Sequence, residues 1–295
     1  IFGDGTIYNS YPDYLCFSTA VNTACYLRLP SAKDKAEDVI RLFKPILEDQ
    51  NKVLISNDVK DDIIWLRRAG VEILNKIFDV KIAHYVLQPD SSHELERVAL
   101  EMLNYRLIKG DNTENPQLSL FPDEGAKKDK DFAERTDILF RLKEKLEEAL
   151  QEVGLYKLYE EIEMPLVSVL ADMEYEGVSI DKVALDELSE DLKIRIAETE
   201  KIIYEMAGKE FNISSPKQLG EILFDQMNID SGNKKTKTGQ YSTSEQVLSK
   251  LEDAHPIVGH ILNYRGLKKL LTTYAEALPT YIDPATGKIH THFNQ

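Results

Sequence analysis

The chain has 295 residues, 42 % of them hydrophobic, which is enough for about two packed domains. Its 51 Asp and Glu residues outnumber 36 Lys and Arg residues, so the formal net charge is −15 at pH 7. This charge excludes a general affinity for polyanions, and without a run near the roughly 20 apolar residues that cross a bilayer we expect no membrane partner.

The start of the chain and its cysteines indicate a cytoplasmic protein. Ile1 is not followed by a charged and then an apolar segment, so we expect no targeting signal. Cys16 and Cys25 lie in apolar, strand-like runs. They could face each other across a hairpin, but such residues are more often reduced core cysteines in a cytoplasmic protein.

The first half of the chain alternates predicted strands with predicted helices. Period-two patterns and a short apolar run predict strands at residues 14–18, 23–29 and 52–56. Apolar residues at helical spacing predict helices at residues 34–49, 61–69, 78–87 and 92–103. This alternation predicts an α/β domain.

A segment rich in Pro, Gly, Asn and mixed charge predicts a loop at residues 110–130. Beyond it, helical periodicity dominates. It predicts helices at residues 132–153, 155–176, 182–207, 215–227, 244–252 and 256–282. The pattern of residues 287–295 predicts a strand. We expect a boundary near residue 160 between the α/β domain and an all-helical domain.

Positive charge gathers in two neighbouring segments of the second half. Residues 254–275 contain no Asp or Glu, and residues 233–244 place three lysines among Thr, Ser and Gly. Backbone N–H groups, hydroxyls and lysines in such a segment can contact phosphates, and predicted N-caps at Ser215 and Ser244 lie nearby. A short lysine run alone is more commonly solvated surface, but two adjacent basic segments indicate a local polyanion contact.

Five sequence blocks in this half resemble those of the family A DNA polymerases, the bacterial polymerase I family. They are EMPLVSVLADMEYEGVSID from Glu163, FNISSPKQLGEILF from Phe211, KTKTGQYSTSEQVL from Lys235, ILNYRGLKKLLTTY from Ile261 and TGKIHTHFNQ from Thr286. Their order and spacing follow the family across residues 160–295. The first half resembles the family's exonuclease-type domain more loosely, through PILE from Pro45 and DVKDDIIWL from Asp58.

The resemblance implies three domains or parts of domains. Residues 1–160 would form a ribonuclease H-like exonuclease fold, an α/β domain with a mixed sheet and helices. Residues 161–285 would form the all-α thumb, which grips the primer–template duplex without regard to sequence. Residues 286–295 would start a palm strand, and we expect the protein to be a monomer.

Position by position, the resemblance also implies which residues contact DNA. Those at a helix start and a thumb tip are Asn212, Ser214, Ser215, Lys234, Lys235, Lys237, Ser242, Thr243 and Ser244. Those that hold primer phosphates or reach the duplex near the active site are Arg265, Lys269, Thr272, Thr273, His292, Asn294 and Gln295. The family often has Arg in place of His292, which departs from the pattern.

Polymerase chemistry in the family depends on a palm and fingers that follow the last block. The palm carries two metal-binding Asp residues, and this sequence stops at Gln295. We therefore expect no polymerase activity and no cofactor in this chain, whereas the resemblance implies Mg²⁺ for the parent enzyme.

The exonuclease site of the family uses four carboxylates that hold two metal ions. Its first pair falls at or before Ile1, the second-motif Asp maps to Asp62, and the third-motif Asp maps to Arg135. A guanidinium repels a divalent metal, so we expect Asp62 and Arg135 to be vestigial positions. A shift of register would instead make Glu134 or Asp137 a ligand.

Two alternatives remain beside a catalytically silent, DNA-binding polymerase fragment. One is an active two-metal 3'-5' exonuclease with displaced ligands, whose metal-dependent release of nucleotides would be lost on Asp62→Ala. The other is a helical scaffold whose basic helix docks an acidic protein. Competition between that protein and duplex DNA would separate the scaffold from the DNA-binding fragment.

Overall fold

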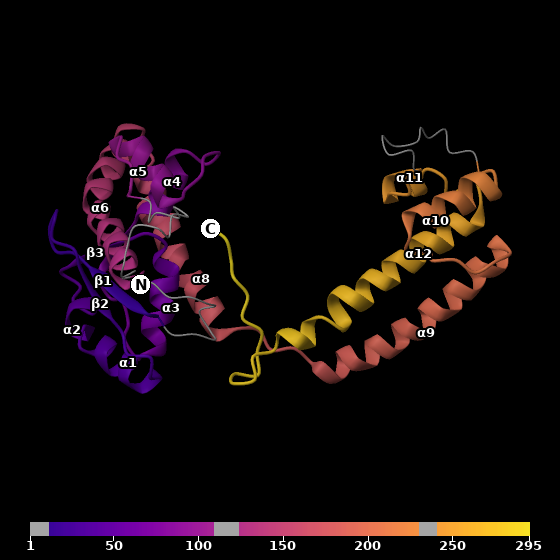
Figure 1. Cartoon of the computed structure of the whole chain (residues 1–295), viewed down its shortest axis with the longest axis horizontal. Helices are drawn as coiled ribbons and strands as arrows, with labels where there is room; N and C mark the ends of the chain where they lie inside the picture. Colours follow the sequence, from indigo (N-terminus) through magenta and orange to yellow (C-terminus); the bar gives the residue numbers. More distant parts are fainter. Residues whose placement is uncertain (1–11, 109–123, 230–240) are drawn as a thin grey trace. The chain divides into compact units, whose positions relative to one another are not determined.

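The computed structural model describes residues 12–108, 124–229 and 241–295, and describes side chains in the helix that begins at Glu124 only from residue 131. Its contacts divide the chain into two units (Figure 1). Unit 1 comprises Ile1–Gly177 and Thr291–Gln295, and unit 2 comprises Val178–His290.

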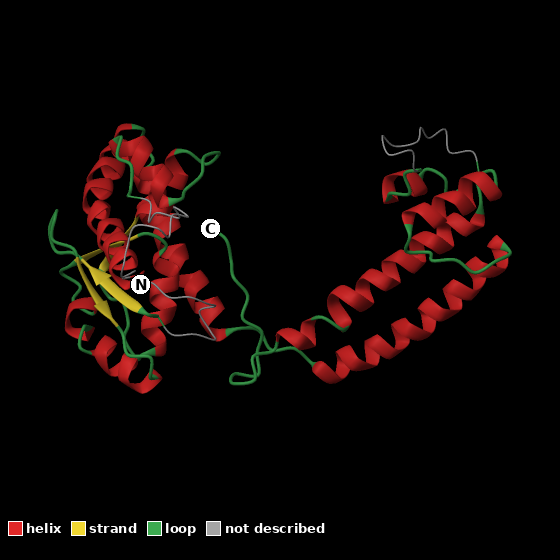
Figure 2. Cartoon of the chain, viewed as in Figure 1, coloured by secondary structure: helices red, strands yellow, loops and turns green. Residues whose placement is uncertain are grey.

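The described strands of unit 1 form two sheets of two strands each (Figure 2). Strand β1 (Tyr14–Phe17) pairs antiparallel with β2 (Cys25–Arg28), and β3 (Val53–Ser56) pairs parallel with β4 (Lys76–Asp79). The single mixed sheet that we expected is therefore not seen among the described residues. The two sheets pack on different cores, since Leu15 of β1 and Leu54 of β3 belong to separate apolar clusters.

The cysteine and strand predictions need two corrections. Cys16 lies opposite Tyr26, so the cysteines are not cross-strand partners, and Cys25 is exposed rather than a core residue. Strand β4 was predicted as the start of a helix. The sequence pattern does not separate the two elements, because β4 is followed directly by the apolar residues of the next helix.

Helices make up more than half of the described residues of unit 1. They are α1 (Lys33–Arg41), α2 (Lys44–Leu47), α3 (Val59–Arg68), α4 (Val80–Leu87), α5 (Leu95–Leu103), α6 (Glu124–Glu152), α7 (Tyr156–Leu158), a π-helical turn (Tyr159–Glu163) and α8 (Met164–Glu176). The single helix expected at residues 34–49 is two, and Pro45 lies in the first turn of the second, where helix starts favour proline. The loop expected at residues 110–130 is helical from Glu124, and residues 109–123 lie outside the described part.

Helix α8 explains why the contact boundary falls at Gly177 rather than near residue 160. Its residues Val167 and Ala171 are fully buried in the same apolar cluster as Ile64 of α3 and Leu142 of α6. Because burial of apolar surface is the main attraction between packed helices, α8 belongs with unit 1.

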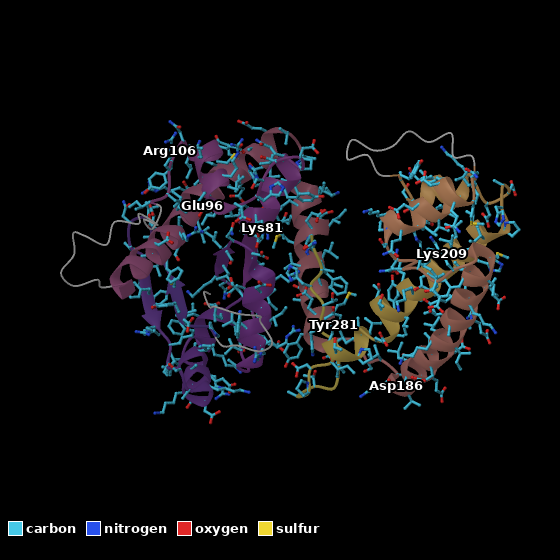
Figure 3. All side chains as sticks on the ribbon, turned by 45° about the vertical axis from the view of Figure 1, so that its right-hand side comes forward. Lys81, Glu96, Arg106, Asp186, Lys209 and Tyr281 are labelled. Carbon is cyan, nitrogen blue, oxygen red and sulfur yellow. The ribbon has the colours of Figure 1, made fainter. Side chains whose placement is uncertain are left out.

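Unit 2 consists of helices in its described residues, apart from one isolated bridge. They are α9 (Lys182–Ala207), α10 (Pro216–Gly220), a π-helical turn (Glu221–Gln226), α11 (Glu245–Ser249), α12 (Pro256–Leu270), a second π-helical turn (Leu271–Ala275) and a 3₁₀ turn (Leu278–Tyr281). Helices α9 and α12 lie alongside each other (Figure 1). Figure 3 marks Asp186 near the start of α9 and Lys209 just beyond its end.

The strand predicted at residues 287–295 does not form. Ile289 makes a single antiparallel bridge to Val178, and no further residues pair there in the described part of the chain. Residues 291–295 instead contact unit 1, where the backbone N–H of Phe293 donates to Glu174 at 2.7 Å. No helix among the described residues has the length and apolar character to cross a membrane.

Candidate nucleic-acid interface

A groove of about 780 Å³ in unit 2 collects half of the predicted DNA contacts. We call it the basic groove. It is lined by Ser214, Pro216, Tyr241, Ser242, Thr243, Ser244, Tyr264, Arg265, Lys268, Lys269, Thr272 and Thr273. These residues come from the start of α10 and the turn before it, from the segment that leads into α11, and from α12 with the π-helical turn after it.

The spacing along α12 puts the cations of the groove on one helix face. Arg265, Lys268, Lys269 and Thr272 occupy positions i, i+3, i+4 and i+7, which share a face of a helix. Lys268 and Lys269 are exposed, and none of the lining residues that the structure describes is acidic. Positive charge and hydroxyl groups therefore face one hollow on an otherwise acidic protein, an arrangement suited to phosphate groups.

The turn before α10 is shaped by its own side chains. Ser215 is the N-cap and accepts from the N–H of Gln218, and the side chain of Asn212 accepts from the N–H of Ser214 at 3.0 Å. The backbone N–H of Asn212 also donates to Gln218 Oε1 at 2.8 Å. Asn212 and Ser215 thus shape the turn, whereas Ser214 lines the groove.

Segment 241–244 is held against the core of unit 2 at its first residue. The Tyr241 hydroxyl donates to Asp225 at 2.7 Å, and its ring lies 4.8 Å from that of Phe224. The backbone of Gly220 passes so close that an added Cβ would lie 3.0 Å from Tyr241 Cβ. A glycine in α10 therefore permits this close approach.

The same segment is also held at Thr243, by Arg265 of α12. Arg265 donates from Nη1 to the backbone oxygen of Thr243 at 2.5 Å, and its Nη2 lies 3.3 Å from the Thr243 hydroxyl. Ser244 is at the N-cap position of α11 but makes no side-chain cap bond, so its expected capping role is not seen.

The structure brings together eight of the residues predicted to bind DNA. They are Ser214, Ser242, Thr243, Ser244, Arg265, Lys269, Thr272 and Thr273. Lys234, Lys235 and Lys237 lie outside the described residues. Lys268, Tyr241 and Tyr264 line the groove without having been assigned to it, and the i+3 spacing of Lys268 from Arg265 was the available signal.

His292, Asn294 and Gln295 belong to unit 1 and do not join this groove. His292 Nδ1 lies 3.5 Å from a carboxylate oxygen of Glu174. Gln295 donates to the backbone oxygen of Glu163 at 2.8 Å and to its carboxylate at 3.0 Å, while Asn294 is exposed. Without a strand in this segment, the side chains of His292 and Gln295 contact acids of α8 and of the π-helical turn before it.

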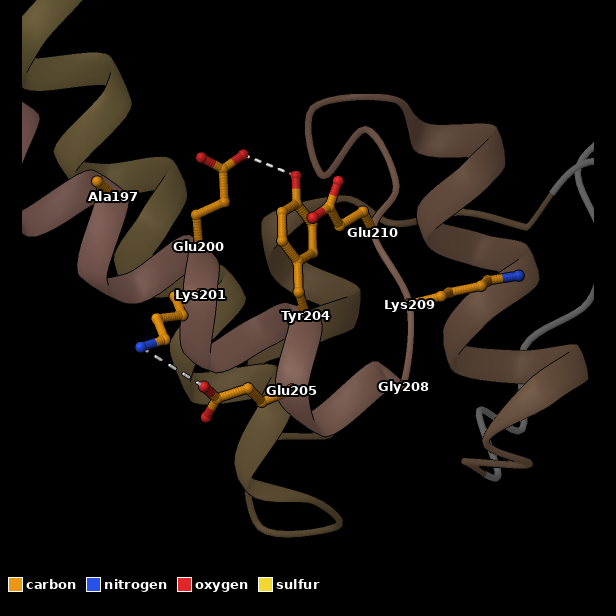
Figure 4. Close-up of a pocket in the computed structure, with 8 residues that line it drawn as sticks. All are labelled: Ala197, Glu200, Lys201, Tyr204, Glu205, Gly208, Lys209 and Glu210. Atoms are coloured by element: carbon orange, nitrogen blue, oxygen red, sulfur yellow. Dashed lines mark hydrogen bonds and ion pairs between the residues drawn. The ribbon is translucent and has the colours of Figure 1, made fainter.

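A second hollow in unit 2 has the opposite character (Figure 4). We call it the acidic hollow; it measures about 570 Å³ and is lined by Ala197, Glu200, Lys201, Tyr204, Glu205, Gly208, Lys209 and Glu210. Three glutamates outnumber two lysines, and the hollow lies at the C-terminal end of α9, where the helix dipole is negative. Both features disfavour phosphate.

The vestigial exonuclease positions do not form a carboxylate set. Arg135 pairs with Glu96, which Figure 3 labels on α5, and with Asp131 at 3.3 Å. Asp62 accepts a hydrogen bond from the Ser56 hydroxyl. A guanidinium that pairs with two acids is not a metal ligand, so Arg135 and Asp62 together do not make a two-metal centre.

The two substitute ligands considered from the sequence are also engaged elsewhere. Glu134 accepts from the Tyr105 hydroxyl at 2.7 Å and from the N–H of Ile108 at 2.9 Å. Asp137 accepts from the backbone N–H of Asn22. Neither residue contacts Asp62 in these bonds. A shift of register that would make Glu134 or Asp137 a metal ligand therefore gains no support.

Burial perturbs two other acids around α3. Asp79 is fully buried, caps α4 through the N–H of Ile82 and accepts from the N–H of Val59 at 2.6 Å. Burial raises the pKa of Asp79 to about 6. Burial, followed by the charge of Asp58, raises the pKa of Asp61 to about 6 as well.

Asp61, Glu174 and His292 are the one set of three potential metal ligands that come close together among the described residues. The ammonium of Lys60 lies 2.6 Å from Glu174 and also donates to the backbone oxygen of Phe293. Because a cation of the chain already neutralises the buried Glu174, we interpret this set as an ion-pair cluster rather than a metal site.

Comparison with known proteins agrees with this division of the chain. Residues 5–151 match the family described as 3'-5' exonuclease, and residues 182–295 match the family described as DNA polymerase family A. The POL domain of Pol1 from M. smegmatis, solved in complex with DNA primer-template and dNTP, is similar with a TM-score of 0.72 and 26 % identity, over 92 % of this chain and 44 % of that chain.

These matches identify the chain as a member of the family A DNA polymerases. Its similar relatives are bacterial DNA polymerase I proteins. The one from Geobacillus stearothermophilus is 38 % identical over 86 % of this chain and 29 % of its own length, and the one from Bacillus subtilis is 36 % identical over 99 % and 32 %. The chain thus spans about three-tenths of these two relatives.

Proposed function

We propose that unit 2 is the thumb of a DNA-directed DNA polymerase and that its basic groove binds the backbone of duplex DNA without sequence preference. The observation that carries this proposal is the set of Arg265, Lys268 and Lys269 in one hollow whose described lining contains no acid. Contacts with phosphates carry no sequence information directly, which suits a protein that must bind any primer–template.

The relatives support the same partner. The similar M. smegmatis POL domain was solved with a DNA primer-template. For the whole protein we propose DNA synthesis in replication and repair, as the names of its polymerase I relatives suggest, with Mg²⁺ as the metal of the polymerase site.

We further propose that the exonuclease-type domain of this chain is inactive. The ion pairs of Arg135 with Glu96 and Asp131 carry this proposal, because they place a neutralised cation where the family has a metal-binding carboxylate. Asp62 then serves as a hydrogen-bond acceptor for Ser56 near the start of α3.

Equilibrium binding to a fluorescein-labelled duplex with a recessed 3' end tests the thumb proposal. The double variant Lys268→Gln/Lys269→Gln should bind roughly ten-fold or more weakly, since two phosphate contacts are lost. The matched control is Lys201→Gln/Lys209→Gln in the acidic hollow of the same unit, which removes the same charge. Equal losses in both variants would mean that net charge, rather than the groove, governs binding.

The scaffold alternative is tested in the same assay. A basic groove that docks an acidic protein would bind heparin-like polyanions and acidic peptides as well as duplex DNA at equal charge. We expect duplex DNA to bind more tightly than a poly-glutamate peptide and to displace it, because the hydroxyl groups of the lining can also bond to phosphate oxygens.

A further inference from the structure

Arg265 differs from the two lysines beside it in what its cationic group contacts. Both terminal nitrogens of its guanidinium face Thr243, one at the backbone oxygen and one at the hydroxyl. Arg265 is half-buried, and burial lowers the pKa of its guanidinium from the ordinary value. Lys268 and Lys269 are exposed and form no ion pair with any acid in the described part of the chain.

The residue that Arg265 holds is central to the groove. Thr243 is only 5 % exposed and lies between Ser242 and Ser244, which both line the groove. A planar guanidinium can bond to a carbonyl and a hydroxyl of one residue at the same time, whereas a lysine ammonium cannot match that geometry. The contact therefore fixes the segment relative to α12 before any DNA is present.

We propose that Arg265 is a positioning residue, which acts through Thr243 to set segment 241–244 for phosphate binding, and that Lys268 and Lys269 are the groove residues of α12 that contact phosphates. This inference rests on the proposed function and refines it. It divides three similar cations of one helix face into one that orders the chain and two that bind the ligand.

The salt dependence of duplex binding separates these roles. Losing one phosphate contact flattens the slope of log K against log salt concentration by about 0.9, because fewer counterions are released. Arg265→Gln should weaken binding of the labelled duplex roughly ten-fold, the effect of losing one charge-assisted hydrogen bond, and leave the slope unchanged. Lys269→Gln should flatten the slope by about one unit.

The conservative variant sharpens the test. Arg265→Lys keeps the charge but loses the two-branched donor, so it should weaken binding as much as Arg265→Gln does. A direct phosphate contact predicts the reverse: the lysine variant would keep affinity, and the glutamine variant would flatten the slope. That pair of results would overturn the proposal while leaving DNA binding by the groove intact.

Two further measurements keep the role of Arg265 testable without reference to DNA affinity. Amide hydrogen exchange of the DNA-free chain should rise in segment 241–244 on Arg265→Lys but not on Lys269→Gln. Thr243→Val, which removes the hydroxyl acceptor, should raise exchange there too and should add little to Arg265→Lys, because both changes act on one contact. Unchanged exchange in both variants would contradict the proposal.

Failure of the proposed function gives a different pattern. If the unaltered chain does not bind the duplex, the groove is not a DNA site, and the exchange measurements still decide whether Arg265 orders the segment. If the Arg265 variants do not fold, Thr243→Val alone carries both the binding and the exchange tests.

Discussion

Asp79 shows how a single buried carboxylate couples stability to pH. Its folded-state pKa of about 6 lies above the ordinary 3.8, so the folded chain binds the proton more tightly than the unfolded chain between these values. Stability from this group is therefore present at low pH and is lost as pH rises from about 4 to about 6.

We expect Asp79→Asn to remove this dependence. The amide does not titrate, so the difference in unfolding free energy between the unaltered chain and the variant should fall by up to about 3 kcal/mol between pH 4 and pH 7. Urea unfolding at several pH values measures it, and the constant cost of altered cap bonds cancels in the comparison. A difference that does not change with pH would show that burial leaves this pKa at its ordinary value.

The ion pairs of Arg135 lead to a prediction about nuclease activity. With added Mg²⁺ or Mn²⁺, the full chain should release no nucleotides from single-stranded DNA, because a paired guanidinium occupies a ligand position. Nucleotide release by the unaltered chain that disappears on Asp62→Ala would favour the active exonuclease instead.

At the scale of single elements, α9 illustrates a helix whose start depends on one cap. Asp181 accepts from the N–H of Ala184 at 3.0 Å, which satisfies a donor that the helix itself leaves unpaired. Asp181→Ala should therefore destabilise the chain by about 1 kcal/mol in thermal unfolding. The matched control is Asp186→Ala, an exposed residue of the same helix with the same charge, which should cost little.

Helix α9 was also the element that the sequence predicted best, because a capping Asp, an apolar period and a closing Gly208 define residues 182–207 locally. Strand β4 depends on pairing with β3, which lies earlier in the chain, so the local pattern missed it. The break after α1 does have a local signal, since Pro45 lies in the first turn of α2, but the helical periodicity of residues 34–49 runs across it. The strand expected at residues 287–295 failed for the converse reason. Its pattern suits a strand, but the described residues provide one bridging partner, Val178.

The features of the basic groove likewise divide into those that local sequence patterns predict and those that they do not. The four-residue spacing of Arg265 and Lys269 predicts that they share a helix face, the resemblance adds Thr272, and the groove contains all three. The bond from Arg265 to Thr243 joins residues 22 positions apart, so no local pattern could indicate it. The contacts of His292 and Gln295 with acids of unit 1 likewise depend on how a whole segment lies.

At the scale of the whole molecule, the proposed binding of DNA depends on positive charge that is confined to one part of an acidic chain. A net charge of −15 repels a phosphate backbone over most of the surface, so binding must be local and strongly dependent on salt. The two units differ in the cations that bear on the proposal. Unit 2 has the basic groove, whereas Arg135 of unit 1 is paired with Glu96.

The salt dependence of duplex binding by the unaltered chain tests the central claim most directly. If about five phosphates are contacted, log K should fall with log salt concentration with a slope of about −4 to −5, and two unrelated duplex sequences should give the same line. A slope near zero, or a clear preference for one of the two sequences, would contradict binding of the DNA backbone in the basic groove.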